Sequence, residues 1–145
     1  KDNREIPPLN YKRVYELKEK FPQLKIIING GITSLDESLH HLNYVDGVMM
    51  GRKAYDDPFL LAQVDHKIFN EEKRDISLDK ILLSLLPYIQ SELDKGTKIS
   101  HITKHLMGLF KGHNGAKGMR KFFVSISDTL NPMDELRFFL SKYVA

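Results

Sequence analysis

Two short apolar runs, each closed by glycine, constrain the fold of this chain more than any other feature. The first covers residues 24–28, is rich in β-branched side chains and leads directly into Asn29-Gly30-Gly31. The second extends from Val45 to Met50 and leads into Gly51-Arg52. Because neither run alternates between apolar and polar residues, both predict strands buried on two faces, as in a parallel sheet.

Helical signals flank both predicted strands. Asn10 can cap a helix that Pro22 ends, and Ser34 and Glu37 have the spacing of a capping box. Asp57-Pro58 predicts a further helix start, with Asp at the cap and Pro in the first turn. The order helix–strand–helix–strand–helix is typical of α/β proteins. Two parallel strands do not complete such a domain, however, and the last two units of a barrel of eight β/α units would have this pattern.

From residue 71 onward the pattern changes to helices alone. A charged connector, residues 71–75, precedes four amphipathic segments, which begin near Ser77, Thr97, Gly115 and Asn131 and have short connections. We therefore expect α/β plus all-α architecture. Residues 1–70 would form the last two β/α units of a TIM barrel, and residues 71–145 a C-terminal four-helix bundle.

The glycine-rich ends of the two predicted strands are the first candidate site. Barrels of this class frequently build a phosphate site from the loops after strands seven and eight. Glycine lets the backbone approach an anion closely, and Arg52 adds a positive charge with a forked donor. Taken singly, each segment is more typical of an ordinary turn, but their paired placement leaves both interpretations open.

The distribution of charge indicates a second candidate site. The chain carries a net charge of +3, and between Lys95 and Ser127 it has seven basic residues and no acidic one. On a helical projection of the third segment, Lys117, Arg120 and Lys121 lie opposite Met119 and the Phe122-Phe123 pair. A phosphate-binding ridge and a solvated helix face are both compatible with this arrangement.

Composition excludes several classes of function. The chain has no cysteine, which rules out disulfides, thiolate metal sites and cysteine catalysis within it. No apolar run approaches the length of a membrane span and no secretory signal is present, so we expect a cytoplasmic protein. His101 and His105 have i,i+4 spacing but no third ligand nearby in sequence, so we expect no metal site. The start at Lys1, without Met, leads us to expect a piece of a larger protein.

Five segments together resemble one enzyme family. They are Arg-Glu-Ile-Pro-Pro-Leu at 4–9, Ile-Asn-Gly-Gly-Ile at 28–32, Asp-Gly-Val-Met-Met-Gly-Arg-Lys-Ala-Tyr at 46–55, His-Leu-Met-Gly-Leu-Phe at 105–110 and Gly-Ala at 115–116. The chain is similar to the tRNA-dihydrouridine synthases, in particular the bacterial A-type branch. This resemblance implies an enzyme that uses NADPH and FMN to reduce the C5–C6 double bond of uridines at positions 20 and 20a in the D-loop of tRNA.

The resemblance also implies roles for individual residues. The FMN phosphate would bind at Asn29, Gly30, Gly31, Gly51 and Arg52, and tRNA at Lys1, Arg4, Lys117 and Arg120, although the family usually has Arg in place of Lys117. The family's catalytic acid is a cysteine outside this chain, so we expect the chain alone to be inactive and to self-associate through exposed strand edges. Two alternatives remain: another FMN-binding TIM-barrel oxidoreductase acting on a small molecule, and a non-enzymatic basic helical RNA-binding module.

Overall fold

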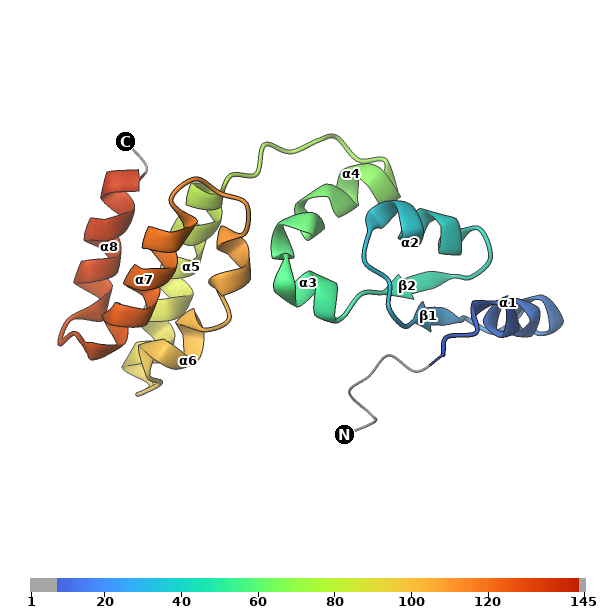
Figure 1. Ribbon diagram of the computed structural model, residues 1–145, viewed down its shortest axis with the longest axis horizontal. Coiled ribbons are helices and arrows are strands. Elements are labelled where there is room, and N and C mark those ends of the chain that lie inside the picture. The colour runs from blue at the N-terminus through green and yellow to red at the C-terminus, as the bar shows by residue number, and fades with distance from the viewer. Residues whose placement is uncertain (1–7, 144–145) are drawn as a thin grey trace. The chain divides into compact units, whose positions relative to one another are not determined.

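The computed structural model describes residues 8–143, with only the backbone described at positions 128 and 143. The described chain is mostly helical and contains a small two-stranded sheet (Figure 1). It separates between Lys73 and Arg74 into two compact units.

The first unit alternates helices and strands. Its elements are α1 (Tyr11–Lys20), β1 (Ile27–Asn29), α2 (Leu35–Leu42), β2 (Gly47–Met49), α3 (Arg52–Asp56), the 3-10 helix η2 (Pro58–Gln63) and α4 (Val64–Phe69). The two strands are parallel, and Ile28 of β1 pairs with Val48 of β2. Because the strands run in the same direction, their carboxyl ends meet at one edge of the sheet.

At the three predicted helix starts of this unit, two side chains form capping hydrogen bonds. The side chain of Asn10 accepts a hydrogen bond from the N–H of Arg13 at 3.1 Å, and Ser34 accepts one from the N–H of Glu37 at 3.0 Å. The predicted helix start at Asp57-Pro58 is confirmed, because Asp57 is the N-cap residue of η2 and Pro58 is its first residue, but the Asp57 side chain makes no capping hydrogen bond. The Asp57 carboxylate instead pairs with Lys53 at 2.9 Å, so a charge one helical turn earlier competes successfully with the cap.

Burial of the first strand is one-sided. Ile28 is only 2% exposed and packs with Val45 and with residues of α1, including Val14. Its neighbour Ile27, whose side chain points to the opposite face, is 66% exposed. The prediction of burial on both faces is therefore wrong for β1 within the described residues, where α1 covers the Ile28 face and no element covers the other.

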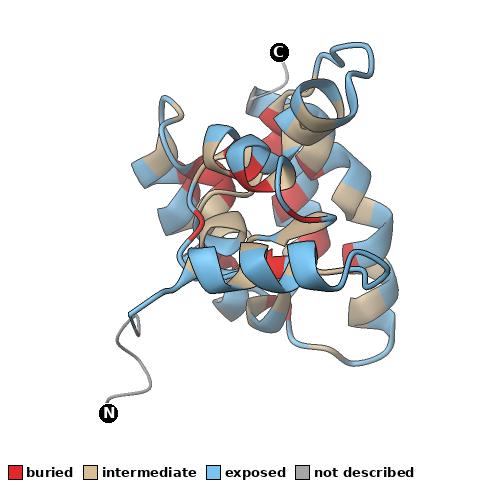
Figure 2. Ribbon diagram, turned by 90° about the vertical axis from the view of Figure 1, so that its right-hand side faces the viewer, coloured by how far each residue is buried: buried red, intermediate tan, exposed pale blue. Residues whose placement is uncertain are grey.

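The second unit consists of helices only. Its elements are α5 (Leu78–Asp94), α6 (Ile99–Thr103), the 3-10 helix η3 (Met107–Phe110), α7 (Ala116–Ser125), the 3-10 helix η4 (Ile126–Asp128) and α8 (Pro132–Tyr143). The largest side chains of its core, Phe110 and Phe123, contact each other with ring centroids 5.0 Å apart. Each of α5, α6, α7 and α8 contributes buried residues to this core, and buried positions are coloured red in Figure 2.

The second helical segment differs from the sequence prediction. It divides into the five-residue α6 and the 3-10 turn η3, and the cap position of α6 is Lys98 rather than Thr97. The hydroxyl of Thr97 donates to the carboxylate of Glu92 at 3.1 Å, which ties the residue to the end of α5 instead.

Candidate functional site

A cavity of about 530 Å³ opens at the edge where β1 and β2 end. It is lined by Asn29, Gly30, Gly31, Ile32, Thr33, Met49, Gly51, Arg52, Lys53 and Asp56. The parallel pairing explains this convergence, because the loops that follow the two strands leave the sheet side by side. The structure thus brings together all five strand-end residues singled out in the sequence, from two segments about twenty positions apart.

The first loop depends on two glycines. Gly30 has φ +130° and Gly31 has φ +63°, backbone conformations that residues with side chains rarely adopt. A Cβ atom on Gly30 would lie 2.8 Å from Cδ2 of Leu9, and one on Gly31 would lie 3.0 Å from Cδ1 of the same residue. Close packing of Leu9 therefore adds to the backbone requirement, and the loop offers its main chain to the cavity.

The charges at this cavity leave one cation unneutralised. Lys53 is paired with Asp57 at 2.9 Å, whereas the exposed guanidinium of Arg52 forms no ion pair with any described residue. Asp56 contributes one carboxylate to the lining. An unpaired guanidinium beside glycine-rich backbone is a suitable arrangement for a phosphate or another small anion.

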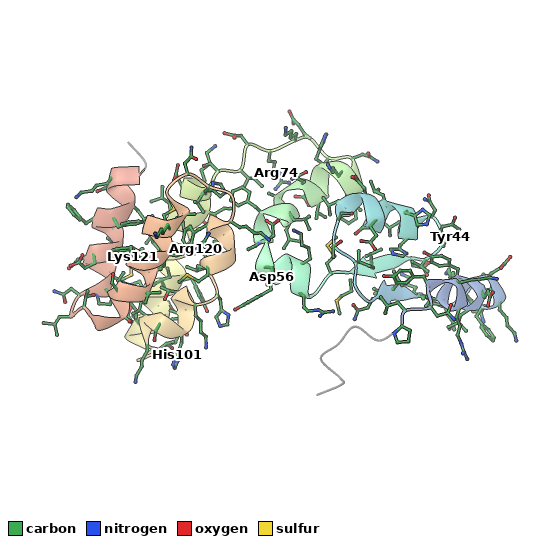
Figure 3. All side chains as sticks on the ribbon, in the orientation of Figure 1. Tyr44, Asp56, Arg74, His101, Arg120 and Lys121 are labelled. Carbon is green, nitrogen blue, oxygen red and sulfur yellow. The ribbon has the colours of Figure 1, made fainter. Side chains whose placement is uncertain are left out.

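The helical unit also carries six exposed cations between positions 98 and 121. We call them the basic residues; they are Lys98, Lys104, Lys111, Lys117, Arg120 and Lys121. None of the six forms an ion pair with a described residue, whereas Lys95 is paired with Glu92 at 2.7 Å. Figure 3 shows Arg120 and Lys121 as neighbours on α7.

The helical projection of α7 is confirmed by burial. Met119 and Phe123 are buried, while Lys117, Arg120 and Lys121 are exposed. The basic side chains therefore contribute little to the core of the unit, and their removal should leave its packing intact.

Other predicted residues fall elsewhere. Lys1 and Arg4 lie outside the described residues. Across residues 8–143, no group of three His, Cys, Asp or Glu side chains is placed to hold a metal ion, and His101 and His105 are both exposed. Within the same range, no helix has the length and apolar character needed to cross a membrane.

Two contacts at the glycine loop were not predicted from the sequence. The hydroxyl of Tyr11 donates to the carbonyl of Gly30, nineteen residues later, and Leu9 packs over both glycines. Neither residue belongs to a local motif that links it to the loop. The only feature of the sequence that could have drawn attention to these residues is that residues 4–9 directly precede a predicted helix start.

Comparison with known proteins identifies the family. A family model described as dihydrouridine synthase (Dus) matches residues 1–143. The chain belongs to the dihydrouridine synthase family. This confirms the resemblance on which the residue roles depend.

Individual relatives support the same assignment. The chain is 49% identical over 122 residues to the tRNA-dihydrouridine(20/20a) synthase of Shewanella oneidensis, and 50% identical over 122 residues to that of Escherichia coli K12. It is 47% identical over 121 residues to the protein of the same name from Vibrio cholerae. These alignments cover 84%, 84% and 83% of this dihydrouridine synthase chain, but only 36%, 35% and 37% of the relatives. The chain therefore spans about a third of the length of the curated relatives it matches.

Proposed function

We propose that this chain is the C-terminal part of a flavin-dependent tRNA-dihydrouridine synthase. Residues 1–70 would supply the last two β/α units of its (β/α)8 barrel, and residues 71–145 a four-helix tRNA-binding domain. The complete enzyme would act in the cytoplasm and reduce uridines 20 and 20a of tRNA with NADPH as reductant. The observation that carries this proposal is the convergence of Asn29, Gly30, Gly31, Gly51 and Arg52 on one cavity.

The charge and the exposed backbone of this cavity support a phosphate as its ligand. The loop after β1 presents backbone at Gly30 and Gly31, where a Cβ would collide with Leu9, and Arg52 supplies a guanidinium without an ion-pair partner among the described residues. Bound FMN supplies the hydride that the reaction needs. The role of this chain's residues is to hold the phosphate end. The chain has no cysteine, so the family's proton-donating cysteine would belong to the rest of the enzyme.

Flavin retention tests the phosphate site. In the full-length enzyme, Arg52→Ala removes a charge-assisted bond of roughly 1.5–3 kcal/mol, so the affinity for FMN should fall by about 10- to 100-fold. Flavin remaining after dialysis is measured by absorbance, together with tRNA affinity, which should change less. Arg13→Ala is the matched control, because Arg13 is an exposed arginine of the same unit and lies outside the cavity lining. Equal flavin content in the Arg52→Ala variant and the wild type would refute the site.

The basic residues support tRNA as the partner of the helical unit. All six are exposed and have no ion pairs among the described residues, and such an excess of positive charge favours a polyanion. Contacts of this kind position an RNA through its phosphates and do not read its sequence. We extend the proposed contacts to Lys1 and Arg4 on the family resemblance alone.

Salt dependence of tRNA binding tests this part of the proposal. Lys117→Ala and Arg120→Ala should each flatten the logarithmic salt slope by roughly 0.7 to 0.9, with flavin content unchanged. Arg120→Ala should cost more affinity, since a guanidinium can hold a phosphate through two hydrogen bonds. The charge-conserving variants Lys117→Arg and Arg120→Lys serve as controls and should keep the wild-type slope. Unchanged slopes in the alanine variants would indicate an ordinary solvated surface and favour a small-molecule substrate.

A further inference from the structure

The glycine loop that follows β1 has few means of fixing its own conformation. Gly30 and Gly31 have no side chains, and both have positive φ. Glycine loses more conformational freedom on ordering than any other residue, so contacts from neighbouring elements must hold such a loop in one shape. The described structure provides one directed contact of this kind, the hydrogen bond from the Tyr11 hydroxyl of α1 to the Gly30 carbonyl.

This hydrogen bond also determines the direction of the next N–H group. The carbonyl of Gly30 and the N–H of Gly31 belong to one trans peptide, so they point in opposite directions. With the carbonyl directed at Tyr11, the N–H of Gly31 points away from α1. Among the described residues, this N–H has no hydrogen-bond acceptor, which leaves it available to a ligand.

Tyr11 is itself held by a cluster of rings around the buried His41. Its ring meets the ring of His41 edge-on, with centroids 4.6 Å apart and planes at 70°. His41 is 2% exposed, and its Nδ1 lies 2.6 Å from the hydroxyl of Tyr15, whose ring stacks on Tyr44. Burial lowers the pKa of His41 below its ordinary value, so the imidazole under Tyr11 is neutral at pH 7.

We propose that Tyr11 is a positioning residue for the phosphate site, because its hydroxyl orients the Gly30–Gly31 peptide so that the N–H of Gly31 is presented to the phosphate. This inference rests on the proposed FMN site. Tyr11 would be an additional residue of that site, although it lies outside the cavity lining and acts on the ligand only through the loop.

The test compares two flavins that differ only in the phosphate. In the full-length enzyme without bound flavin, affinities for FMN and riboflavin are measured by quenching of flavin fluorescence. Tyr11→Phe removes the hydroxyl and keeps the ring on His41. It should weaken FMN binding by about 5- to 10-fold, the effect of one hydrogen bond, and leave riboflavin binding unchanged. Tyr44→Phe is the matched control, since it removes a hydroxyl from the same cluster without a contact to the loop.

Each outcome decides between a positioning role and the alternatives. Equal weakening of both flavins, or a lower melting temperature of the flavin-free protein, would indicate general support of the fold and overturn the inference. Unchanged FMN affinity in Tyr11→Phe, with the FMN preference abolished in Arg52→Ala, would overturn this inference alone. A wild-type enzyme that binds FMN no better than riboflavin would overturn the proposed phosphate site and this inference with it.

Discussion

The two ends of the small parallel sheet use charge in opposite ways. At the amino ends of the strands, the Lys18 ammonium donates to the carbonyls of Pro22 and Leu24 and to the carboxylate of Asp46, at 2.9, 2.7 and 2.9 Å. Asp46 also accepts a hydrogen bond from the N–H of Ile26 at 2.8 Å. Lys18 and Asp46 therefore neutralise each other at this end.

The carboxyl ends show the contrary arrangement. There Arg52 has no ion-pair partner among residues 8–143, and the cavity is lined by glycine backbone. In β/α barrels, the carboxyl ends of the strands carry chemistry, whereas features of the amino ends serve stability. Mutations at the two ends should therefore have different effects. Those at the amino ends should change folding stability, and those at the carboxyl ends should change ligand binding.

The largest expected effect comes from a side chain added to the glycine loop. Gly30→Ala forces a Cβ to within 2.8 Å of Leu9 at φ +130°, which should cost about 1–3 kcal/mol and abolish flavin retention. Gly96→Ala is the control: it also has positive φ (+85°), but no atom within 4 Å would meet its Cβ. Melting temperature and bound flavin are measured for both variants. Retention of FMN by Gly30→Ala would show that the loop conformation does not matter to the ligand.

The uncovered face of the sheet, which carries Ile27, should cause the 145-residue chain to self-associate when it is studied alone. Ile27 is 66% exposed on this face of β1. Ile27→Lys should therefore shift the sedimentation profile toward monomer, because a charge on this face opposes its burial against a second copy of the chain. Leu130→Lys is the control, since Leu130 is 99% exposed but belongs to the helical unit and not to the sheet. A wild-type chain that stays monomeric at high concentration would contradict the prediction.

The smallest expected effect is on folding stability at acidic pH, and it comes from the amino ends of the two strands. The N–H of Ile26 and, next, the ammonium of Lys18 lower the pKa of Asp46 below its usual value. The stabilisation is fully present above the ordinary carboxyl pKa of about 3.9 and is lost as the pH falls through the lower folded value. Asp46→Asn should therefore be less stable than wild type at neutral pH and lose less on acidification. Urea midpoints at several pH values measure this, and the preference for FMN over riboflavin should not change.

Local features of this fold could be predicted from sequence, and contacts between distant residues could not. Asn10 and Ser34 cap helices as expected, because a cap involves residues three positions apart. The glycine-closed strand ends also indicated where the cavity would lie. The bond from Tyr11 to Gly30 had no local signal, because it depends on how α1 packs against the loop. The exposure of Ile27 likewise depends on what covers the sheet and not on the residue itself.

The central claim is that the carboxyl ends of β1 and β2 hold the phosphate of FMN. A crystal structure of the full-length enzyme with bound FMN tests it most directly. We predict the phosphate in the cavity lined by Gly30, Gly31 and Gly51, within hydrogen-bond distance of the Arg52 guanidinium and the Gly31 N–H. A phosphate bound at any other part of the barrel, with Arg52 facing solvent, would contradict the account.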